Sequence, residues 1–428
     1  MKCSESTLQY IQREIRRACE AFKGRSAGSE AERACQAHFA KELNGWSDEV
    51  RTEPFRLHPE AFLGWIIPTS ALAIAAAALV WVQLLTGARW AALLGFACAT
   101  LALLPCLGEF ILYRQWFDFA FPAKESANVY ARRKPSGEIK RRIIFGGHAD
   151  AAYEMAYVLH PDKRMIFRVI GGALGGVLCM WCSSLAFFLQ SFSGPMQPSG
   201  VWLFMGVLAI LGIPALLAGF FFINKKQVVD GANDNLSGCL VAMGVLREMA
   251  RQGVRLQNTE VCCLITGGEE SGLRGAMAFV KAHKEELKAV DTVFIALETL
   301  RETGQLMVYP LGMNGTQKNS RRATALLQKA GRRLGFPLRE AGLYPGATDA
   351  EAFSREGLTA CGLCGVDHAP QPYYHTRYDT FDNISPECLR RSLDLCLETA
   401  ALFDGQAEAA TPKDAPIPAA RALGERAS

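Results

Sequence analysis

Five short segments of the chain place potential metal ligands in turns or just after apolar runs. Apolar runs over residues 142–145, 260–266 and 292–297 are each followed closely by histidine or glutamate. The candidates are His148 and Asp150 in GGHAD, Asp234 in DGANDNLSG, Glu269 and Glu270 in GGEESG, Glu298, and His375 in YYHT. Single polar residues in turns are often caps, but a recurring set of imidazoles and carboxylates is typical of a catalytic metal centre.

These residue types favour a pair of divalent metal ions. Imidazole and carboxylate ligands suit catalytic zinc, which keeps one position open for water. Two ions a few ångströms apart need a shared carboxylate, and Asp234 lies centrally among the other candidates in the sequence. We assign His148 and Glu298 to one Zn²⁺, Glu270 and His375 to the other, and Asp234 to both. The same ligands also accept manganese or cobalt.

Two further carboxylates are expected to act as catalytic residues beside the ligands. Asp150 follows His148 by two residues and is expected to accept a hydrogen bond from that imidazole, which fixes its tautomer. Neighbouring side chains on an extended backbone point apart, so Glu269 and Glu270 are given different roles. Glu269 is expected to be the general base, which takes a proton from the attacking water and passes it to the leaving amine.

Strand-like and helix-like segments alternate around these candidates. The expected strands are residues 49–57, 259–266, 290–297, 305–309 and 357–366, and the expected helices are 236–251, 272–287, 318–334 and 386–403. A further helix is expected to start after Ser29 and to run to about Leu43, with Glu32 completing a capping box. This alternation predicts the α/β class, with a mixed, largely parallel sheet sandwiched by helices. In such sheets, sites form beyond the carboxyl ends of the strands, which is where His148, Glu269 and Glu298 fall.

Two pairs of long apolar runs interrupt this pattern. Residues 61–85, 90–112, 167–192 and 201–223 are each long enough to cross a bilayer. They predict two inserted transmembrane hairpins, in a multi-pass cell membrane protein. The catalytic domain is then expected from residues 1–60, 114–165 and 224–404, the hairpins at 61–113 and 166–223, and a disordered tail at 405–428. Gly171, Gly172, Gly175 and Gly176 give small-xxx-small spacings that allow close helix packing in lipid.

Charge and cysteine content bear on the partners of the chain, on the role of its cysteines and on its orientation in the membrane. A net charge of +4 over 428 residues is too small to indicate a nucleic-acid partner. The 14 cysteines form no regular framework, and Cys361 and Cys364 in a lone CxxC are expected in a buried strand rather than a zinc ribbon. Lys and Arg gather on the domain side of the spans, where they include Arg114, Arg164, Arg168, Lys225 and Lys226, whereas the hairpin tips offer only Arg89. This asymmetry predicts a cytoplasmic catalytic domain.

The ordered elements HxD, DGANDNxSG, GGEExG, a carboxylate after an apolar strand, and YHTxxDTxDNI resemble the di-zinc exopeptidases of clan MH. That family contains bacterial leucyl aminopeptidases, with glutamate carboxypeptidase and glutaminyl cyclase as relatives. The resemblance implies the zinc exopeptidase fold, the ligands already assigned and Glu269 as base. It also places Asp349, in GATD, on the substrate side. The chain departs from the family in carrying Glu298 where its aminopeptidases usually have Asp, and in the membrane hairpins.

The sequence therefore predicts a membrane-anchored metallopeptidase that hydrolyses a peptide bond, with a di-zinc aminopeptidase favoured. Its expected partners are a peptide substrate and the lipid bilayer. One alternative is a single-zinc acyl transferase of the glutaminyl cyclase type, which does not need His148 as a ligand. Another is a non-catalytic membrane receptor or scaffold, although a domain without catalysis has no physical need to gather so many carboxylates. A channel or transporter is disfavoured because the spans carry almost no charge.

Overall fold

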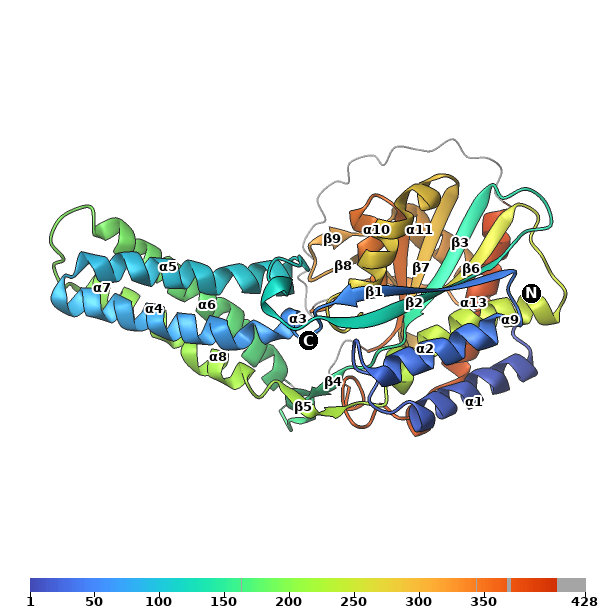
Figure 1. The fold of residues 1–428 in the computed structure, drawn as a ribbon, viewed down its shortest axis with the longest axis horizontal. Coiled ribbons are helices and arrows are strands. Elements are labelled where there is room, and N and C mark those ends of the chain that lie inside the picture. Colours follow the sequence, from blue (N-terminus) through green and yellow to red (C-terminus); the bar gives the residue numbers. More distant parts are fainter. Residues whose placement is uncertain (163, 344, 368–370, 406–428) are drawn as a thin grey trace.

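A mixed sheet lies at the centre of the domain that carries the candidate residues in the computed structural model (Figure 1). The structure describes the chain except residues 163, 344, 368–370 and 406–428, so most of the expected tail lies outside the described residues. In the described residues the sheet has nine strands in the order β1-β2-β6-β3-β7-β11-β8-β10, with β9 paired to β8. The strands are β1 (Glu49–Leu57), β2 (Lys124–Arg133), β3 (Arg141–His148), β6 (Thr259–Thr266), β7 (Asp291–Leu300), β8 (Leu306–Gly312), β9 (Gln317–Lys318), β10 (Arg339–Gly342) and β11 (Thr359–Gly365).

The middle of the sheet is parallel, and the strands on either side of this central group run antiparallel to it. Strands β6, β3, β7 and β11 run parallel to one another, whereas β2 and β8 pair with this group in the antiparallel sense. Every residue of β3 and β6 is buried, because helices cover both faces, and their sequences accordingly read as almost continuous apolar runs. The expected α/β architecture is confirmed. The CxxC cysteines are free and fully buried in β11, as expected.

Seven helices complete the two outer layers. One face carries α1 (Glu5–Ala21), α2 (Glu30–Leu43), α9 (Gly238–Arg251), α11 (Arg321–Arg333) and α13 (Pro386–Asp404), and the other carries α10 (Arg274–Lys288) and α12 (Asp349–Arg355). Helix α9 presents Leu240 and Val241 to the apolar core beneath the sheet. On the opposite face, the rings of Phe294 and Phe353 stack with centroids 3.9 Å apart. The sheet therefore lies between two apolar cores.

Four helical rods project from one end of this domain as an arm (Figure 1). Each is long and apolar enough to cross a membrane, and together they cover Ala61–Thr86, Arg89–Ile111, Met165–Gln190 and Gly200–Gly219. They comprise α3 (Ala61–Gly64), α4 (Ile66–Thr86), α5 (Arg89–Pro105), η1 (Cys106–Ile111), α6 (Met165–Gln190), α7 (Gly200–Leu211) and α8 (Ile213–Gly219). Large apolar side chains such as Leu85 and Phe192 are exposed on the arm, as a lipid environment requires.

The fourth rod ends earlier than the sequence suggested and is broken. It was expected to continue to Ile223, but the helix stops at Gly219 and Ile223 begins β5 (Ile223–Val228). Pro214 has no N–H to donate, which accounts for the break between α7 and α8 at Gly212.

Two of the four glycines in α6 mediate close packing. A Cβ on Gly176 would lie 2.3 Å from the Cα of Gly212, and one on Gly172 would lie 2.8 Å from Ala215. Gly171 and Gly175 have open space beside them. The small-residue contact between the second pair of rods therefore uses one stripe of α6.

Candidate metal centre

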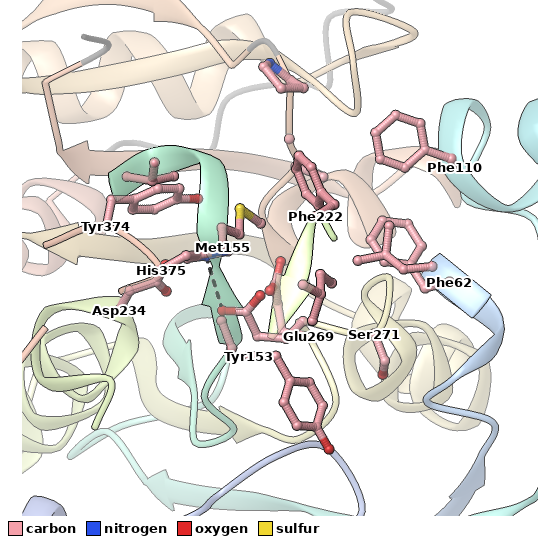
Figure 2. Close-up of a pocket in the computed structure, with 18 of the residues that line it drawn as sticks. Phe62, Phe110, Tyr153, Met155, Phe222, Asp234, Glu269, Ser271, Tyr374 and His375 are labelled. Carbon is pink, nitrogen blue, oxygen red and sulfur yellow. Dashed lines mark hydrogen bonds and ion pairs between the residues drawn. The ribbon is translucent and has the colours of Figure 1, made fainter. Parts of the chain in front are cut away.

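The five candidate ligands meet at the carboxyl ends of the parallel strands. His148 ends β3, Glu298 lies near the end of β7, and Glu270 follows β6 by four residues. Asp234 lies in η4 (Ala232–Ser237), which leads into α9, and His375 comes from the loop before η6 (Phe381–Asn383). In Figure 2, Asp234, Glu269 and His375 face the same cavity.

The two imidazoles lie against opposite oxygens of the Asp234 carboxylate. The Nε2 atom of His148 lies 3.2 Å from Asp234 Oδ1 and 3.5 Å from Glu298 Oε1. The Nε2 atom of His375 lies 2.8 Å from Asp234 Oδ2 and 3.3 Å from Glu270 Oε1. One oxygen of Asp234 therefore stands with His148 and Glu298, and the other with His375 and Glu270, which is the grouping that the sequence suggested.

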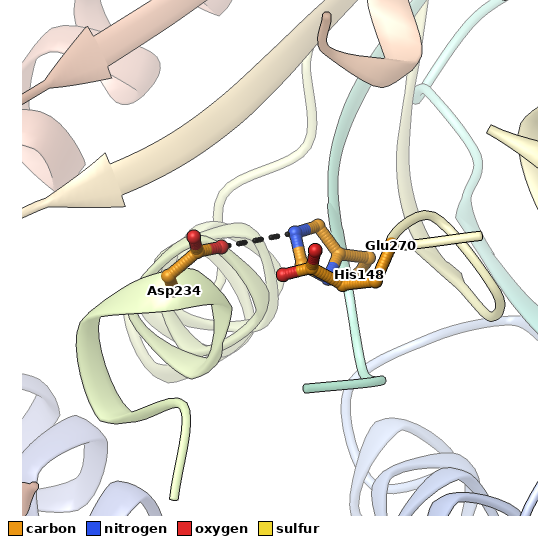
Figure 3. A group of neighbouring side chains, drawn as sticks. All are labelled: His148, Asp234 and Glu270. Atoms are coloured by element: carbon orange, nitrogen blue, oxygen red, sulfur yellow. Dashed lines mark ion pairs between the residues drawn. The ribbon is translucent and has the colours of Figure 1, made fainter. Parts of the chain in front are cut away.

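The donor chemistry of this group suits a divalent metal ion. Ligand atoms of His148, Asp234 and Glu270 all lie within 4.8 Å of one another (Figure 3). Among the described residues, the Nε2 atom of His148 and the Oε1 atom of Glu270 are buried and have no hydrogen-bond partner. Burial without a partner is costly for polar atoms, and coordination of zinc by imidazole and carboxylate would satisfy both.

Two glycines allow the close backbone packing that places the candidate ligands His148 and Asp234 side by side. A Cβ on Gly147 would lie 2.7 Å from the backbone nitrogen of Cys239. One on Gly238 would lie 2.3 Å from the carbonyl oxygen of Leu297. Both distances are too short for real Cβ contacts. The ends of β3 and β7 can therefore approach the start of α9 closely, which places His148 beside Asp234.

Asp379 holds the turn that carries Asp234, a role that the sequence reasoning missed. Its Oδ1 accepts hydrogen bonds from the backbone N–H and the side-chain amide of Asn233, both at 2.8 Å. Its Oδ2 accepts from the backbone N–H of Asp234 at 3.0 Å. Asn235 in turn donates to Glu298 Oε2 at 3.1 Å. The available signal was the position of Asp379, four residues after His375 in the quoted YHTxxD element.

Asp150 contacts the imidazole as expected but also fixes the glutamate loop. The Nδ1 atom of His148 lies 3.4 Å from Asp150 Oδ1, and it lies closer, at 3.1 Å, to the Asp150 carbonyl oxygen. The two carboxylate oxygens of Asp150 accept the backbone N–H groups of Glu269 and Glu270 at 3.1 and 3.0 Å. The tautomer is thus directed largely by a carbonyl, because the carboxylate is shared with the loop.

Glu32 supports the same loop from α2. Ser29 caps that helix by accepting the N–H of Glu32 at 3.0 Å, as expected. The expected capping box is not completed, because the Glu32 carboxylate instead accepts the N–H groups of Gly28 and Gly268 at 2.7 and 2.9 Å. Gly268 has φ of +63°, a conformation that favours glycine and turns the chain toward Glu269.

Electrostatics in the site reflect an excess of buried acid. Burial raises the pKa of Glu269 and of Glu270, and it raises the pKa of Glu298 to about 8. Burial alone would lower the pKa of His148 and His375, yet the surrounding carboxylates raise the pKa of both. The surrounding carboxylates therefore favour positive charge at the two imidazoles. Metal cations bound between these side chains would supply that positive charge.

Three other residues differ from, or extend, the expectations. Asp349, expected on the substrate side, is buried behind the cavity and accepts a hydrogen bond from Thr266. Tyr374 does line the cavity, and its ring stacks on His375 with centroids 4.1 Å apart. Arg377 is directed away and forms a two-pronged ion pair with Glu154 at 2.7 Å.

Both hairpins are tied to loops that carry candidate ligands. Hairpin one is held by Arg274, which follows the glutamate loop and forms ion pairs with Glu109 and Asp118. Hairpin two is flanked by β4 (Tyr153–Met155), which pairs with β5 and donates the Met155 N–H to the His375 carbonyl at 2.8 Å. The arm and the site are thus one connected structure.

Comparison with known proteins indicates a metallopeptidase. Residues 221–400 match the model of a family described as peptidase family M28. The matched segment contains Glu269 and four of the five ligand candidates, whereas His148 and Asp150 precede it. The chain is 28% identical over 167 residues to endoplasmic reticulum metallopeptidase 1 of Rattus norvegicus, which covers 38% of this chain. That alignment spans only 18% of the length of the relative.

Solved structures share the fold at low sequence identity. An aminopeptidase from Aneurinibacillus sp. strain AM-1 has a TM-score of 0.54 and 16% identity, and the match covers 95% of this chain and 96% of that one. A glutaminyl cyclase from an Acidobacteriales bacterium has a TM-score of 0.52 and 14% identity, with 94% and 97% covered. Peptidases and cyclases therefore share this architecture, so the fold by itself does not separate the two activities.

Proposed function

We propose that this chain, in which residues 221–400 match the model of peptidase family M28 and four helices are long and apolar enough to cross a membrane, is a membrane-anchored metallopeptidase, specifically a di-zinc aminopeptidase. The proposal rests on one observation: the imidazoles of His148 and His375 lie against opposite oxygens of the Asp234 carboxylate, and each imidazole has one glutamate beside it. Bound there, two zinc ions would lower the pKa of a coordinated water and polarise a substrate carbonyl.

The chain's own residues supply the proton transfers in this proposal. Glu269 Oε2 lies 3.7 Å from His148 Nε2, at the edge of the ligand group, and its side chain is 12% exposed. That position lets it receive a proton from the attacking water and return it to the leaving amine. Asp150 keeps Glu269 in place by accepting its backbone N–H.

The position of His148 favours the peptidase over the single-zinc cyclase alternative. The cyclase reading leaves His148 without a role as ligand, yet its Nε2 is buried beside Asp234 and Glu298 with no hydrogen-bond partner. The gathered carboxylates also argue against a non-catalytic scaffold, because their burial is costly unless cations are held.

Metal analysis combined with peptide digestion tests the proposal. We expect two zinc ions per chain and release of the first residue from peptides with a free amino terminus, with no release when that amine is acetylated. Glu269→Gln should retain both ions and lose roughly 10²- to 10⁴-fold in turnover. Glu285→Gln, an exposed position on α10, is the matched control and should behave as wild type. A single zinc ion together with cyclisation of glutaminyl peptides would support the alternative instead.

We also propose that the catalytic domain faces the cytoplasm. Support comes from the basic residues where the rods join the domain, which include Arg114, Arg164 and Lys225, against Arg89 alone among the hairpin tips. Protease protection of sealed vesicles tests the orientation, since only one sidedness leaves the domain accessible from outside.

A further inference from the structure

The cavity that contains the candidate metal centre continues to the base of the membrane arm. It has a volume of about 660 Å³, and its inner wall is formed by Asp234, Glu269 and the neighbouring ligands. All four rods contribute to its outer wall, with Phe62 and Ile67 from the first, Phe110 from the second, Ile170 from the third and Gly219 from the fourth. Figure 2 shows Phe62, Phe110 and Phe222 on one side of the cavity, separated from the acidic group.

The mouth of this cavity lies among exposed apolar residues at the base of the arm. Ile67, Phe167 and Phe220 line the cavity and are also 63%, 45% and 42% exposed. They lie in the first turns of α4 and α6 and directly after α8. A side chain that both lines a cavity and is exposed marks the opening of that cavity. Because these helices are long and apolar enough to cross a membrane, we place the opening at the edge of the bilayer.

Charge marks the boundary of the apolar wall. Glu60 and Lys225 line the cavity beside the arm, are more than half exposed in their side chains, and form an ion pair at 3.3 Å. Such a pair suits the headgroup layer, where charged groups remain hydrated. The cavity thus passes from an acidic inner end, past apolar walls, to a mouth near the membrane surface.

We infer that the substrate is a peptide whose apolar portion stays in the bilayer while its scissile amide reaches the centre through this lateral mouth. The inference rests on the proposed peptidase function and names its substrate class. A peptide diffusing from water would leave the large phenylalanine and isoleucine surface at the mouth without an apolar partner. An apolar chain rising from the membrane covers that surface along its whole path.

Three peptides with the same amino-terminal residues test the inference on the zinc-loaded full chain in phosphatidylcholine vesicles. One continues into a soluble polar tail, and the second continues into a segment of about 20 apolar residues that inserts into the bilayer. The third has the polar tail joined by a long Gly/Ser linker to a phospholipid anchor. The anchored peptide reproduces the concentration at the membrane but brings no apolar chain to the mouth.

At equal surface density, we expect kcat/KM for the inserted peptide to exceed that for the anchored peptide by about tenfold or more. Ile170→Trp fills the cavity wall on α6, and Ile67→Trp narrows the mouth independently. Each should lower kcat/KM for the inserted peptide by about tenfold more than for the other two peptides. Leu178→Trp is the matched control, because Leu178 lies on the same helix, is 53% exposed and does not line the cavity.

Equal kcat/KM for the inserted and anchored peptides in the wild type would overturn the inference while leaving the peptidase proposal intact. Equal loss for all three peptides in Ile170→Trp and Ile67→Trp would also overturn it, because a lateral path predicts a selective effect. Absence of turnover with every peptide would instead refute the proposed function.

Discussion

The support that Asp379 gives to Asp234, the proposed bridging ligand, can be tested by replacing a single oxygen. Asp379 is fully buried and accepts three hydrogen bonds, two from Asn233 and one from the backbone N–H of Asp234. Asp379→Asn keeps the shape of the side chain but turns one acceptor into an amide donor. Whichever way the amide is oriented, an N–H group of the turn then faces a second donor.

The size of the effect follows from that lost acceptor. Leaving one buried donor unsatisfied costs roughly 1–3 kcal/mol. If this cost falls on the turn that presents Asp234, metal affinity decreases by roughly 5- to 150-fold. Loss of a group that orients a metal ligand typically lowers affinity by roughly 10- to 100-fold, which agrees with this range.

Competition for zinc against a fluorescent chelator measures the affinity directly and does not depend on turnover. Asp382→Asn is the matched control, since the same substitution three residues later removes an exposed carboxylate. We expect Asp382→Asn to bind zinc as the wild type does. Wild-type affinity in Asp379→Asn, or equal loss in both variants, would refute the claim that Asp379 positions the ligand turn.

Three further predictions concern the arm, pH and metal. Arg274→Met leaves two carboxylate partners unpaired at the joint with hairpin one and should cost roughly 3–5 kcal/mol of unfolding free energy, seen as a lower melting temperature, whereas the exposed Lys281→Met should not. Burial by itself raises the pKa of Glu248, but hydrogen bonds from Arg251 and Ser4 outweigh it and lower the pKa to about 2. The ionised carboxylate therefore contributes its full stability above the ordinary pKa of 4.5 and loses it as pH falls toward 2, so the melting temperatures of wild type and Glu248→Gln should converge across that window. A failure to converge would contradict the cause given for the shift. Finally, zinc at 100 times its Kd should stabilise the folded chain by about 2.7 kcal/mol per site, and chelation should reverse this; no shift on zinc addition would count against a metal centre.

Much of the architecture could be predicted because local sequence patterns report burial directly. Apolar runs followed closely by a candidate ligand marked β3 and β6, and four long apolar runs marked the rods of the arm. Predictions were poorer where a residue has a choice of partners. Glu32 suggested a capping box, yet its carboxylate bonds to Gly28 and Gly268, because a buried acid takes whichever donors the fold brings near.

The sequence by itself determined the candidate ligands and the elements that carry them, since apolar periodicity and motif spacing are local properties of the chain. Only the tertiary structure decided how these groups are held and approached. Asp379 reaches the Asp234 turn across 145 positions, and the glycines at 147 and 238 matter only because two strands and a helix converge there. The lateral mouth likewise forms because residues from all four rods line one cavity. No local sequence pattern predicts a contact between segments so far apart in the chain.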